Sequence, residues 1–210
     1  MLYLNVPFNE KDEAKSLYAK WDNQKKQWYA TKPEFYYKFR KWIPGSIVFT
    51  RDVGILEGTT TCWKCKKKTK VFAFSADSTN VFDVTEDRYI NVIDETGYDL
   101  QLWSISEDIP EKIKEILTKE FGCKIKYSKT VNDTYFANVC NHCDSLQGNY
   151  FLYSEVDGPF GMYGDSKLLF YKFKLKNDLP SYLYPDAQIS PNYRYMDRTQ
   201  AIETNHEINI

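Results

Sequence analysis

The chain has 210 residues, a net charge of −1 and an aromatic content of 17%. This length can bury a sizeable hydrophobic core, and so many aromatic side chains argue against a disordered chain. The near-neutral charge excludes strong overall attraction to nucleic acid. No apolar run approaches the roughly 20 residues that span a bilayer, so we expect no membrane partner.

The charges are unevenly distributed along the chain. Residues 1–45 contain nine Lys or Arg against five Asp or Glu, and residues 46–70 contain six against two. Residues 71–111 reverse this balance, with one against ten. A basic block followed by an acidic one can be a pair of solvated faces, or it can mark a phosphate-binding surface. Both interpretations stay open at this point.

The first 45 residues predict a small module of strands and helices. A strand is expected over residues 2–6, and a helix capped by Asn9 follows it. Four apolar side chains share one face of that helix: Ala14, Leu17, Tyr18 and Trp21. A strand over residues 27–30 precedes a second helix, which a capping box of Thr31 and Glu34 begins. Its shared apolar face consists of Phe35, Phe39 and Trp42. We describe this module as ββα-type, with its end at Pro44-Gly45.

The same module resembles a known family. The resemblance lies in Leu4-Asn5-Val6-Pro7-Phe8, residues 10–15, Leu17, residues 19–22, Lys26 and Trp28-Tyr29. These residues are similar to a small bacterial accessory domain of unknown function. It recurs on plasmid conjugation primases, topoisomerase-like proteins and other mobile-element proteins. The resemblance covers residues 2–43 and implies a nucleic-acid-handling context, but it brings no catalytic residue. One departure is Tyr18, where the family usually carries Gly, so the helix end is expected to differ there.

Four cysteines form two identical short spacings, Cys62-x-x-Cys65 and Cys140-x-x-Cys143. Two such knuckles supply the tetrahedral thiolate ligands of a structural zinc ribbon. Residues 66–139 separate them, whereas a simple ribbon has about 15 to 20 residues there. We therefore expect one Zn²⁺ that joins distant segments and encloses an inserted subdomain. An iron site and a redox-active CxxC pair remain as alternatives. Catalytic zinc is disfavoured, because four thiolates leave no open position.

Each knuckle predicts its own local structure. The residue after the second cysteine often has a positive φ, and this chain carries Lys66 and Asp144 there. Strands are expected over residues 71–74 and 150–153, and residues 136–139 lead into the second knuckle. His142 lies within that knuckle and is expected to point outward rather than replace a cysteine ligand.

The knuckle residues also carry a weaker resemblance. It lies in Cys62-Trp63-x-Cys65 with Thr69, and in Cys140-x-His142-Cys143 with Gln147-Gly148 and Phe151-Leu152. These residues are similar to uncharacterised bacterial proteins with paired CxxC knuckles that carry the same N-terminal module. The resemblance implies one architecture but no defined activity.

The remaining residues predict a mainly antiparallel β domain. Strands with acidic turns are expected over residues 81–93, a helix begins near Ile109-Pro110, and a strand follows at residues 125–127. The buried stripe of the helix consists of Ile109, Ile113, Ile116 and Leu117. Cys123 is expected to be a buried small hydrophobe. A flexible loop is expected over residues 158–165 and a terminal strand over residues 168–175. The fold class is thus α+β: the module (1–45), a zinc-ribbon domain (46–180) with an insertion (66–139), and an extended tail (181–210).

No pattern in the sequence indicates an enzyme. The sequence contains only two histidines, and it has no nucleophile elbow, phosphate loop or HExxH motif. We therefore recognise no catalytic set. We expect a cytoplasmic accessory protein of a plasmid or phage that binds nucleic acid or a nucleic-acid-processing enzyme, with no small-molecule substrate. The candidate nucleic-acid-binding residues are Lys20, Lys25, Lys26, Tyr29, Arg40, Lys41, Trp63, Lys66, Lys67 and Lys68. The alternative is a protein–protein adaptor or inhibitor with a DNA-mimicking acidic face over residues 71–111.

Overall fold

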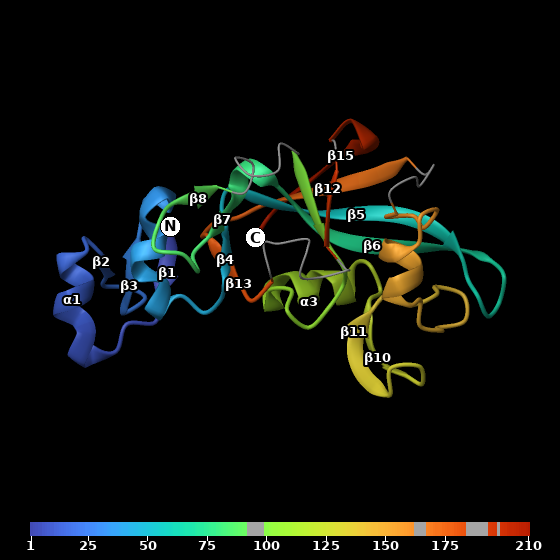
Figure 1. The fold of residues 1–210 in the computed structure, drawn as a ribbon, viewed down its shortest axis with the longest axis horizontal. Helices are drawn as coiled ribbons and strands as arrows, with labels where there is room; N and C mark the ends of the chain where they lie inside the picture. The colour runs from blue at the N-terminus through green and yellow to red at the C-terminus, as the bar shows by residue number, and fades with distance from the viewer. Residues whose placement is uncertain (92–98, 162–166, 184–192, 197) are drawn as a thin grey trace.

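The protein is described by a computed structural model that covers residues 1–91, 99–161, 167–183, 193–196 and 198–210. In this part of the chain the structure is mostly antiparallel β-sheet with few helices. The N-terminal module lies at one end of the molecule, and the tip of the hairpin between β5 and β6 lies at the other (Figure 1).

The N-terminal module is a three-stranded antiparallel sheet in the order β1-β3-β2. Its elements are β1 (Leu2–Leu4), the 3₁₀ turn η1 (Phe8–Glu10), α1 (Lys11–Ser16), β2 (Lys20–Asp22), β3 (Gln27–Ala30) and the 3₁₀ helix η2 (Pro33–Trp42). The expected ββα arrangement is not confirmed, because a helix separates the first two strands and the module ends in a 3₁₀ helix. Its hydrophobic core also continues into Val48 and Val84 of the following domain.

The first helix is shorter than expected and ends at Ser16. Tyr18 adopts a left-handed φ of 69°. The N–H groups of Tyr18 and Ala19 donate to the carbonyls of Lys15 and Ala14, at 2.9 and 3.0 Å. These bonds form the helix termination that usually has Gly at the left-handed position. The termination is therefore retained here with a tyrosine, whose side chain is 90% exposed.

Two further details of the module differ from expectation. Trp21 lies in β2 rather than on the helix, and neither the Asn9 cap nor the capping box at Thr31 forms. The second helix buries Tyr36 where Phe35 was expected. The reason is its period: a 3₁₀ helix has about 3.0 residues per turn. Its buried face therefore repeats every third residue, at Tyr36, Phe39 and Trp42.

A six-stranded sheet in the order β14-β9-β6-β5-β12-β15 forms the centre of the protein. Its strands are β5 (Asp52–Thr61), β6 (Lys68–Asp77), β9 (Leu100–Trp103), β12 (Leu168–Lys174), β14 (Tyr193–Met196) and β15 (Ala201–Asn209). All pairings are antiparallel except that of β12 with β15. The strand expected over residues 168–175 is confirmed as β12, but it is not the terminal strand, because β14 and β15 follow it in the chain.

Two smaller sheets flank the central one. The four-stranded sheet β13-β4-β7-β8 consists of β13 (Leu179–Ser181), β4 (Ile47–Phe49), β7 (Val81–Asp83) and β8 (Ile90–Asn91). The hairpin consists of β10 (Lys124–Ser128) and β11 (Asp133–Ala137). The strands expected over residues 81–91 and 125–127 are confirmed, whereas residues 92 and 93 lie outside the described part.

The remaining helical segments are the 3₁₀ turns η3 (Ser78–Asn80) and η5 (Arg198–Gln200), the helix α3 (Glu111–Lys119) and the π-helical turn η4 (Tyr150–Ser154). The buried stripe of α3 is confirmed, since Ile109, Ile113 and Leu117 are buried and Ile116 packs against them. Gly122, with a φ of 72°, follows the helix end.

The strand expected over residues 150–153 is wrong, because those residues form η4. Tyr150 and Phe151 are exposed whereas Leu152 and Tyr153 are buried. This pattern cannot lie on alternating faces of a strand. The buried Tyr153 hydroxyl contacts the carbonyl of Phe72 and accepts a bond from the N–H of Ile105, at 3.2 Å.

Both faces of the central sheet are covered. One face packs against α3 and β11, and its core includes Ile55, Phe74 and Ile113. The other face packs against η4, and its core includes Leu56 and Leu152. Neighbouring residues of β5 therefore enter different cores, which explains its run of consecutive buried residues.

Residues 66–139 were expected to be an insertion, and that expectation is wrong. This region supplies β6 and β9, which lie within the central sheet, as well as β7 and α3. It is therefore an integral part of the core rather than a subdomain enclosed by the knuckles.

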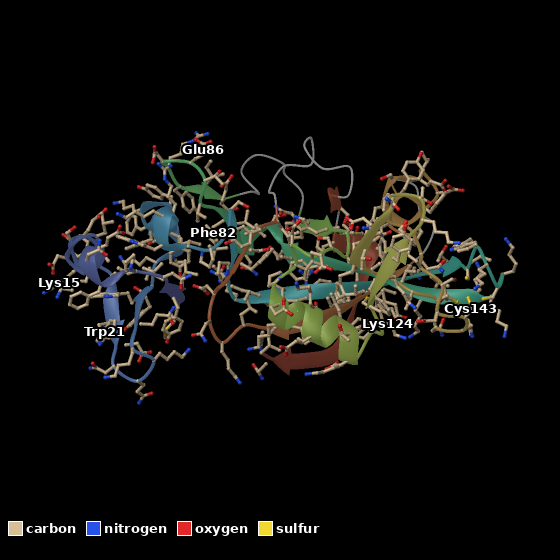
Figure 2. The ribbon with its side chains drawn as sticks, turned by 90° about the horizontal axis from the view of Figure 1, so that it is seen from below. Lys15, Trp21, Phe82, Glu86, Lys124 and Cys143 are labelled. Carbon is tan, nitrogen blue, oxygen red and sulfur yellow. The ribbon has the colours of Figure 1, made fainter. Side chains whose placement is uncertain are left out.

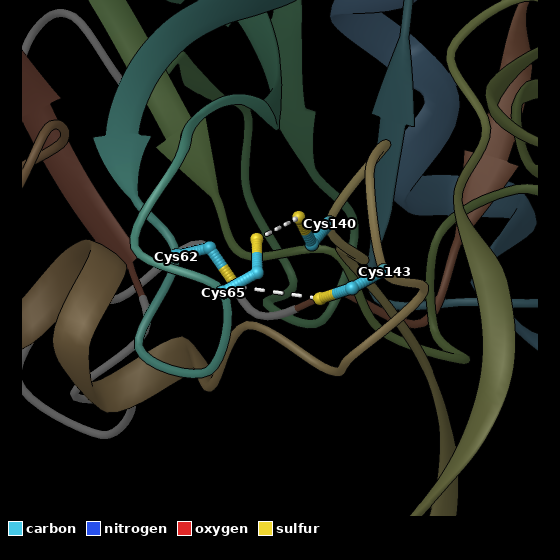
Figure 3. Close-up of side chains that lie close together, drawn as sticks. All are labelled: Cys62, Cys65, Cys140 and Cys143. Atoms are coloured by element: carbon cyan, nitrogen blue, oxygen red, sulfur yellow. Dashed lines mark hydrogen bonds between the residues drawn. The ribbon is translucent and has the colours of Figure 1, made fainter.

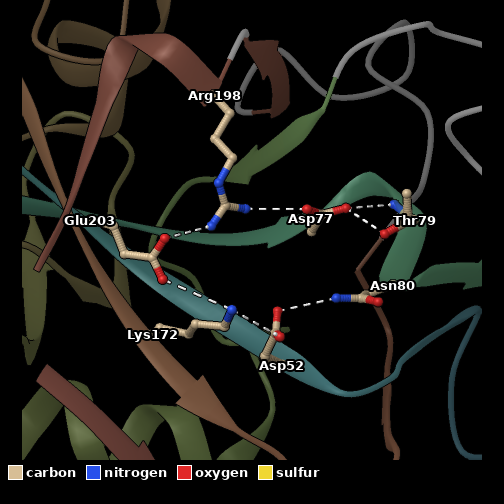
Figure 4. A network of polar contacts seen from close by, with 7 residues as sticks. All are labelled: Asp52, Asp77, Thr79, Asn80, Lys172, Arg198 and Glu203. Atoms are coloured by element: carbon tan, nitrogen blue, oxygen red, sulfur yellow. Dashed lines mark hydrogen bonds and ion pairs between the residues drawn. The ribbon is translucent and has the colours of Figure 1, made fainter. Parts of the chain in front are cut away.

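The residues after Pro180 are also built into the sheets where they are described. A network of alternating charges joins η5 and β15 to the strands β6, β12 and β5 (Figure 4). Arg198 contacts Asp77 at 3.2 Å and Glu203 at 3.1 Å. Lys172 lies 3.9 Å from Glu203 and 3.4 Å from Asp52. The expected tail includes residues 184–192 and 197, which lie outside the described residues.

Candidate metal centre and basic surfaces

The first knuckle is the tip of the β5–β6 hairpin. The Cys62 N–H donates to the Lys67 carbonyl at 2.9 Å, and the Lys66 N–H donates to the Cys62 carbonyl at 2.9 Å. Lys66 has a φ of 61°, the left-handed conformation that closes the turn. The backbone therefore wraps around the two thiols of Cys62 and Cys65.

The second knuckle repeats this geometry. The Cys140 N–H donates to the Ser145 carbonyl at 2.8 Å, and the Asp144 N–H donates to the Cys140 carbonyl at 2.9 Å. Asp144 has a φ of 57°. The positive φ expected after each second cysteine is thus confirmed in both knuckles.

The four cysteine sulfurs of the knuckles converge (Figure 3). Their Sγ atoms all lie within 4.8 Å of one another. Two contacts between the knuckles, Cys62 to Cys143 and Cys65 to Cys140, are both 3.7 Å. Four sulfurs bound tetrahedrally at a Zn–S distance of about 2.3 Å lie about 3.8 Å apart. The cluster therefore has the donor set and the spacing to hold one metal ion such as zinc.

The protein environment shifts the pKa values of the knuckle thiols in opposite directions. Desolvation acts to raise the pKa of Cys62, but hydrogen bonds from the Ser145 hydroxyl and from backbone N–H groups lower it to about 5. The Ser145 hydroxyl also lowers the pKa of Cys143. At Cys65 a backbone N–H acts to lower the pKa, but desolvation and the adjacent sulfurs raise it to about 11. Four thiolates this close repel one another, and a divalent cation relieves that repulsion.

Side chains also join the two knuckles directly. The Trp63 indole N–H donates to the Leu146 carbonyl at 2.7 Å. A ring nitrogen of His142 lies 2.9 Å from the Lys68 carbonyl. His142 is not a member of the sulfur cluster, which agrees with its expected outward orientation.

A second connection fixes the approach to the knuckles. The N–H of Asn141 donates to the Thr69 hydroxyl at 3.1 Å. The buried Asn138 amide accepts from the Phe72 N–H at 2.7 Å and donates to the Phe72 carbonyl at 2.9 Å. Asn138 thus pairs with β6 as a neighbouring strand would. Its place between apolar residues just before a knuckle was the only signal in the sequence, and sequence reasoning missed it.

The lysines beside the first knuckle can offset the negative charge of a metal–thiolate cluster. Lys64, Lys66, Lys67 and Lys68 are all exposed around the four sulfurs. One divalent ion and four thiolates carry a net charge of about −2, so nearby cations stabilise the centre. This role requires no nucleic acid.

The structure brings together the predicted residues Lys20, Lys25 and Tyr29 on the outer face of the module's sheet. Lys20 lies directly opposite Tyr29 in the pairing of β2 with β3. The Tyr29 ring lies 6.0 Å from that of Tyr3, and the Lys25 ammonium lies 4.0 Å above the Tyr3 ring. Tyr3 is a residue of this face that the sequence did not indicate. Lys26 lies next to it in the exposed turn between the strands.

Arg40 and Lys41 point away from that face into ion pairs. Arg40 contacts Asp87 at 2.9 Å. Lys41 contacts Glu10 at 3.2 Å and Glu13 at 2.6 Å. These contacts already neutralise both cations within the protein.

The predicted nucleic-acid residues therefore do not form one surface. The module and the knuckles lie at opposite ends of the protein, as the labelled Trp21 and Cys143 show (Figure 2). Lys20, Lys25, Lys26 and Tyr29 belong to the first end. Trp63, which is 62% exposed, and the lysines of the knuckle belong to the other.

Comparisons with known proteins identify the module. Residues 1–44 match the family described as "Domain of unknown function (DUF5710)", and they are a domain of that family. The resemblance seen in the sequence is thus confirmed. No solved structure matches the chain.

Two curated relatives match the same segment. Both are named DNA primase TraC, from Escherichia coli. One is 50% identical over 44 residues and the other 52% identical over 40 residues. These matches cover 21% and 19% of this chain but only 3% and 4% of the relatives. The N-terminal module is therefore similar to a small segment of proteins named as DNA primases. Among the described residues, no helix is long and apolar enough to cross a membrane.

Proposed function

We propose that this chain is a non-enzymatic, cytoplasmic accessory protein of a plasmid or phage that binds nucleic acid through its N-terminal module. The outer face of the module's sheet is the observation that carries the proposal. It combines the rings of Tyr3 and Tyr29 with the ammonium groups of Lys20 and Lys25. Aromatic rings and unneutralised cations on one sheet face provide stacking and phosphate contacts together.

The acidic side chains of the module support this interpretation by their orientation. Asp22 accepts the Tyr3 hydroxyl at 2.8 Å and the N–H groups of Gln24 and Lys25. Glu10 and Glu13 face Lys41 instead. These three carboxylates have partners within the module, and the exposed lysines of the outer face remain available to phosphate. The module that carries this face is the segment that matches proteins named as DNA primases.

The metal is part of the proposal. Zinc is the ion best suited to four thiolates in tetrahedral geometry, and a four-coordinate thiolate site has no open position for catalysis. We assign it a structural role: it holds the tips of the two knuckles together. Elemental analysis of purified protein should find about one zinc per chain.

Fluorescence anisotropy tests the binding function. The full chain is titrated into labelled single- and double-stranded DNA and RNA at several salt concentrations. Binding should weaken steeply with salt, because phosphate contacts release counterions. Replacing Lys20 and Lys25 by Ala should weaken binding and reduce the salt slope by about 0.7 per lysine on single strands.

A charge-matched control separates a specific face from general attraction. Lys112 and Lys129 are exposed lysines outside the module. Their replacement by Ala removes the same charge and should leave the affinity within about twofold of the wild type. Equal losses in the two double variants would contradict a binding face on the module. No binding at low salt would leave the protein-partner alternative.

A further inference from the structure

The N-terminal module contains a cleft that does not belong to the outer sheet face. Its volume is about 430 Å³, and its walls include Phe8, Lys11, Trp21, Lys26 and Trp28. The residues come from η1, α1, β2, β3 and the turn between the last two. This volume falls within the range of about 300–1,000 Å³ that is typical of small-ligand pockets.

The aromatic walls of the cleft are exposed. Phe8 is 81% and Trp21 43% accessible to solvent, and neither belongs to the module's core. Trp21 leans edge-on against Trp28, with ring centroids 5.4 Å apart. Exposed rings that converge on a cleft contribute nothing to the core and suit an occupant with flat apolar faces.

The charge at the cleft is positive. The Lys11 ammonium lies 4.2 Å from the centre of the Phe8 ring, and Lys26 is exposed at the rim. Among the described residues, the walls of the cleft contain no acidic one, and the neighbouring Glu10 is engaged by the Trp42 indole at 2.6 Å and by Lys41. The cleft therefore favours an occupant that combines flat rings with negative charge, and a nucleotide has both.

We infer that this cleft holds an unstacked base of single-stranded nucleic acid, with the adjacent phosphates on Lys11 and Lys26. A duplex keeps its bases stacked inside, so it cannot present a base face to Phe8 and Trp21. The inference rests on the proposed function and adds a preference for single strands. Lys26 lines the cleft and its neighbour Lys25 lies over the outer face, so one strand passes from one surface to the other.

The test measures the affinity of the full chain for a labelled oligothymidine and for a hairpin duplex of equal charge. Phe8→Ala removes an exposed ring, so the fold should persist, which the thermal midpoint checks. It should weaken oligothymidine binding about tenfold and leave duplex binding unchanged, because base stacking on one ring has about that effect. Lys11→Gln should weaken single-strand binding as well. Tyr18→Ala is the control, since it removes an exposed aromatic ring of the module outside the cleft.

The possible failures are distinguishable. If the wild type binds oligothymidine and Phe8→Ala binds it equally well, the cleft inference is overturned and the proposed function stands. Equal weakening of single-strand and duplex binding by Phe8→Ala also overturns the inference. If the wild type binds no oligonucleotide at low salt, the proposed function and the inference both fail.

Discussion

Replacing Cys143 by Ser removes one ligand from the four-sulfur cluster and should abolish tight metal binding. Structural zinc contributes about 10–16 kcal/mol in zinc-finger peptides. Without it, and apart from bonds to the thiols, the knuckles are joined mainly by Trp63–Leu146, by His142–Lys68 and by two bonds between Thr69 and Asn141. At about 0.5–1.5 kcal/mol each, four such bonds supply about 2–6 kcal/mol. The metal is therefore expected to dominate the closure of the knuckles.

The loss should remain local. None of the four cysteine ligands belongs to the three hydrophobic core clusters, and the central sheet is buried on both faces without them. We expect the knuckle tips to open while the sheet stays folded. Hydrogen exchange should rise at residues 62–67 and 140–146 and stay slow at residues 71–74. Zinc content, measured after dialysis against a mild chelator, should fall from about one per chain to near zero.

Cys123→Ala is the matched control, because Cys123 is a buried cysteine outside the cluster. This variant should retain one zinc and the slow exchange of the knuckles. Two results would refute the reasoning. If the purified wild-type protein contained no bound metal, the proposed metal centre would be wrong. Global unfolding of Cys143→Ser would show that the sheet depends on the metal.

Three further predictions concern stability and reactivity. Tyr18→Gly relieves a left-handed strain of about 1–2 kcal/mol at the cost of about 0.5–1 kcal/mol in chain entropy. The thermal midpoint should therefore rise by about 1–4 °C, and a fall would contradict the strain. Asn138→Leu leaves the Phe72 N–H buried without its partner, whereas the Phe72 carbonyl keeps the Tyr153 hydroxyl, so urea denaturation should show a loss of about 1–3 kcal/mol. Burial raises the pKa of the Cys123 thiol to about 12. Cys123 also lies in the hydrophobic core, so a thiol reagent at about pH 8 should modify the four knuckle cysteines once metal removal opens the knuckles, and Cys123 only after denaturation.

The sequence predicted the elements whose causes are local. The knuckles follow from cysteine spacing and from a turn that closes within six residues, and even the left-handed Lys66 and Asp144 were expected. The stripe of α3 follows from the 3.6-residue period of an α-helix. These features need no information about distant residues, which is why their positions were right.

The predictions were wrong where contacts between residues distant in sequence, or a helical period other than 3.6 residues, determine the structure. The aromatic residues of η2 fit an α-helical face through Phe35, but the 3₁₀ period selects Tyr36. Residues 66–139 looked like an insertion because the knuckles bracket them. Their strand β6 pairs along its length with β5, which no local pattern reveals. At η4 a run of apolar residues was compatible with a strand. The buried Tyr153 hydroxyl instead contacts Phe72 and Ile105, which are distant in sequence and which no local pattern reveals.

The structure is needed to interpret the distribution of charge along the chain. The acidic stretch over residues 71–111 suggested a face that mimics DNA, but several of its carboxylates have partners within the protein. Asp87 pairs with Arg40 of the module, Asp77 pairs with Arg198, and Asp83 accepts the backbone N–H and the hydroxyl of one threonine. In the module, Lys20 and Lys25 share the outer face with Tyr3 and Tyr29 and form no ion pair in the described part of the chain. Part of the charge pattern therefore reflects contacts within the fold, and the positive charge of these two lysines is what a phosphate backbone can bind.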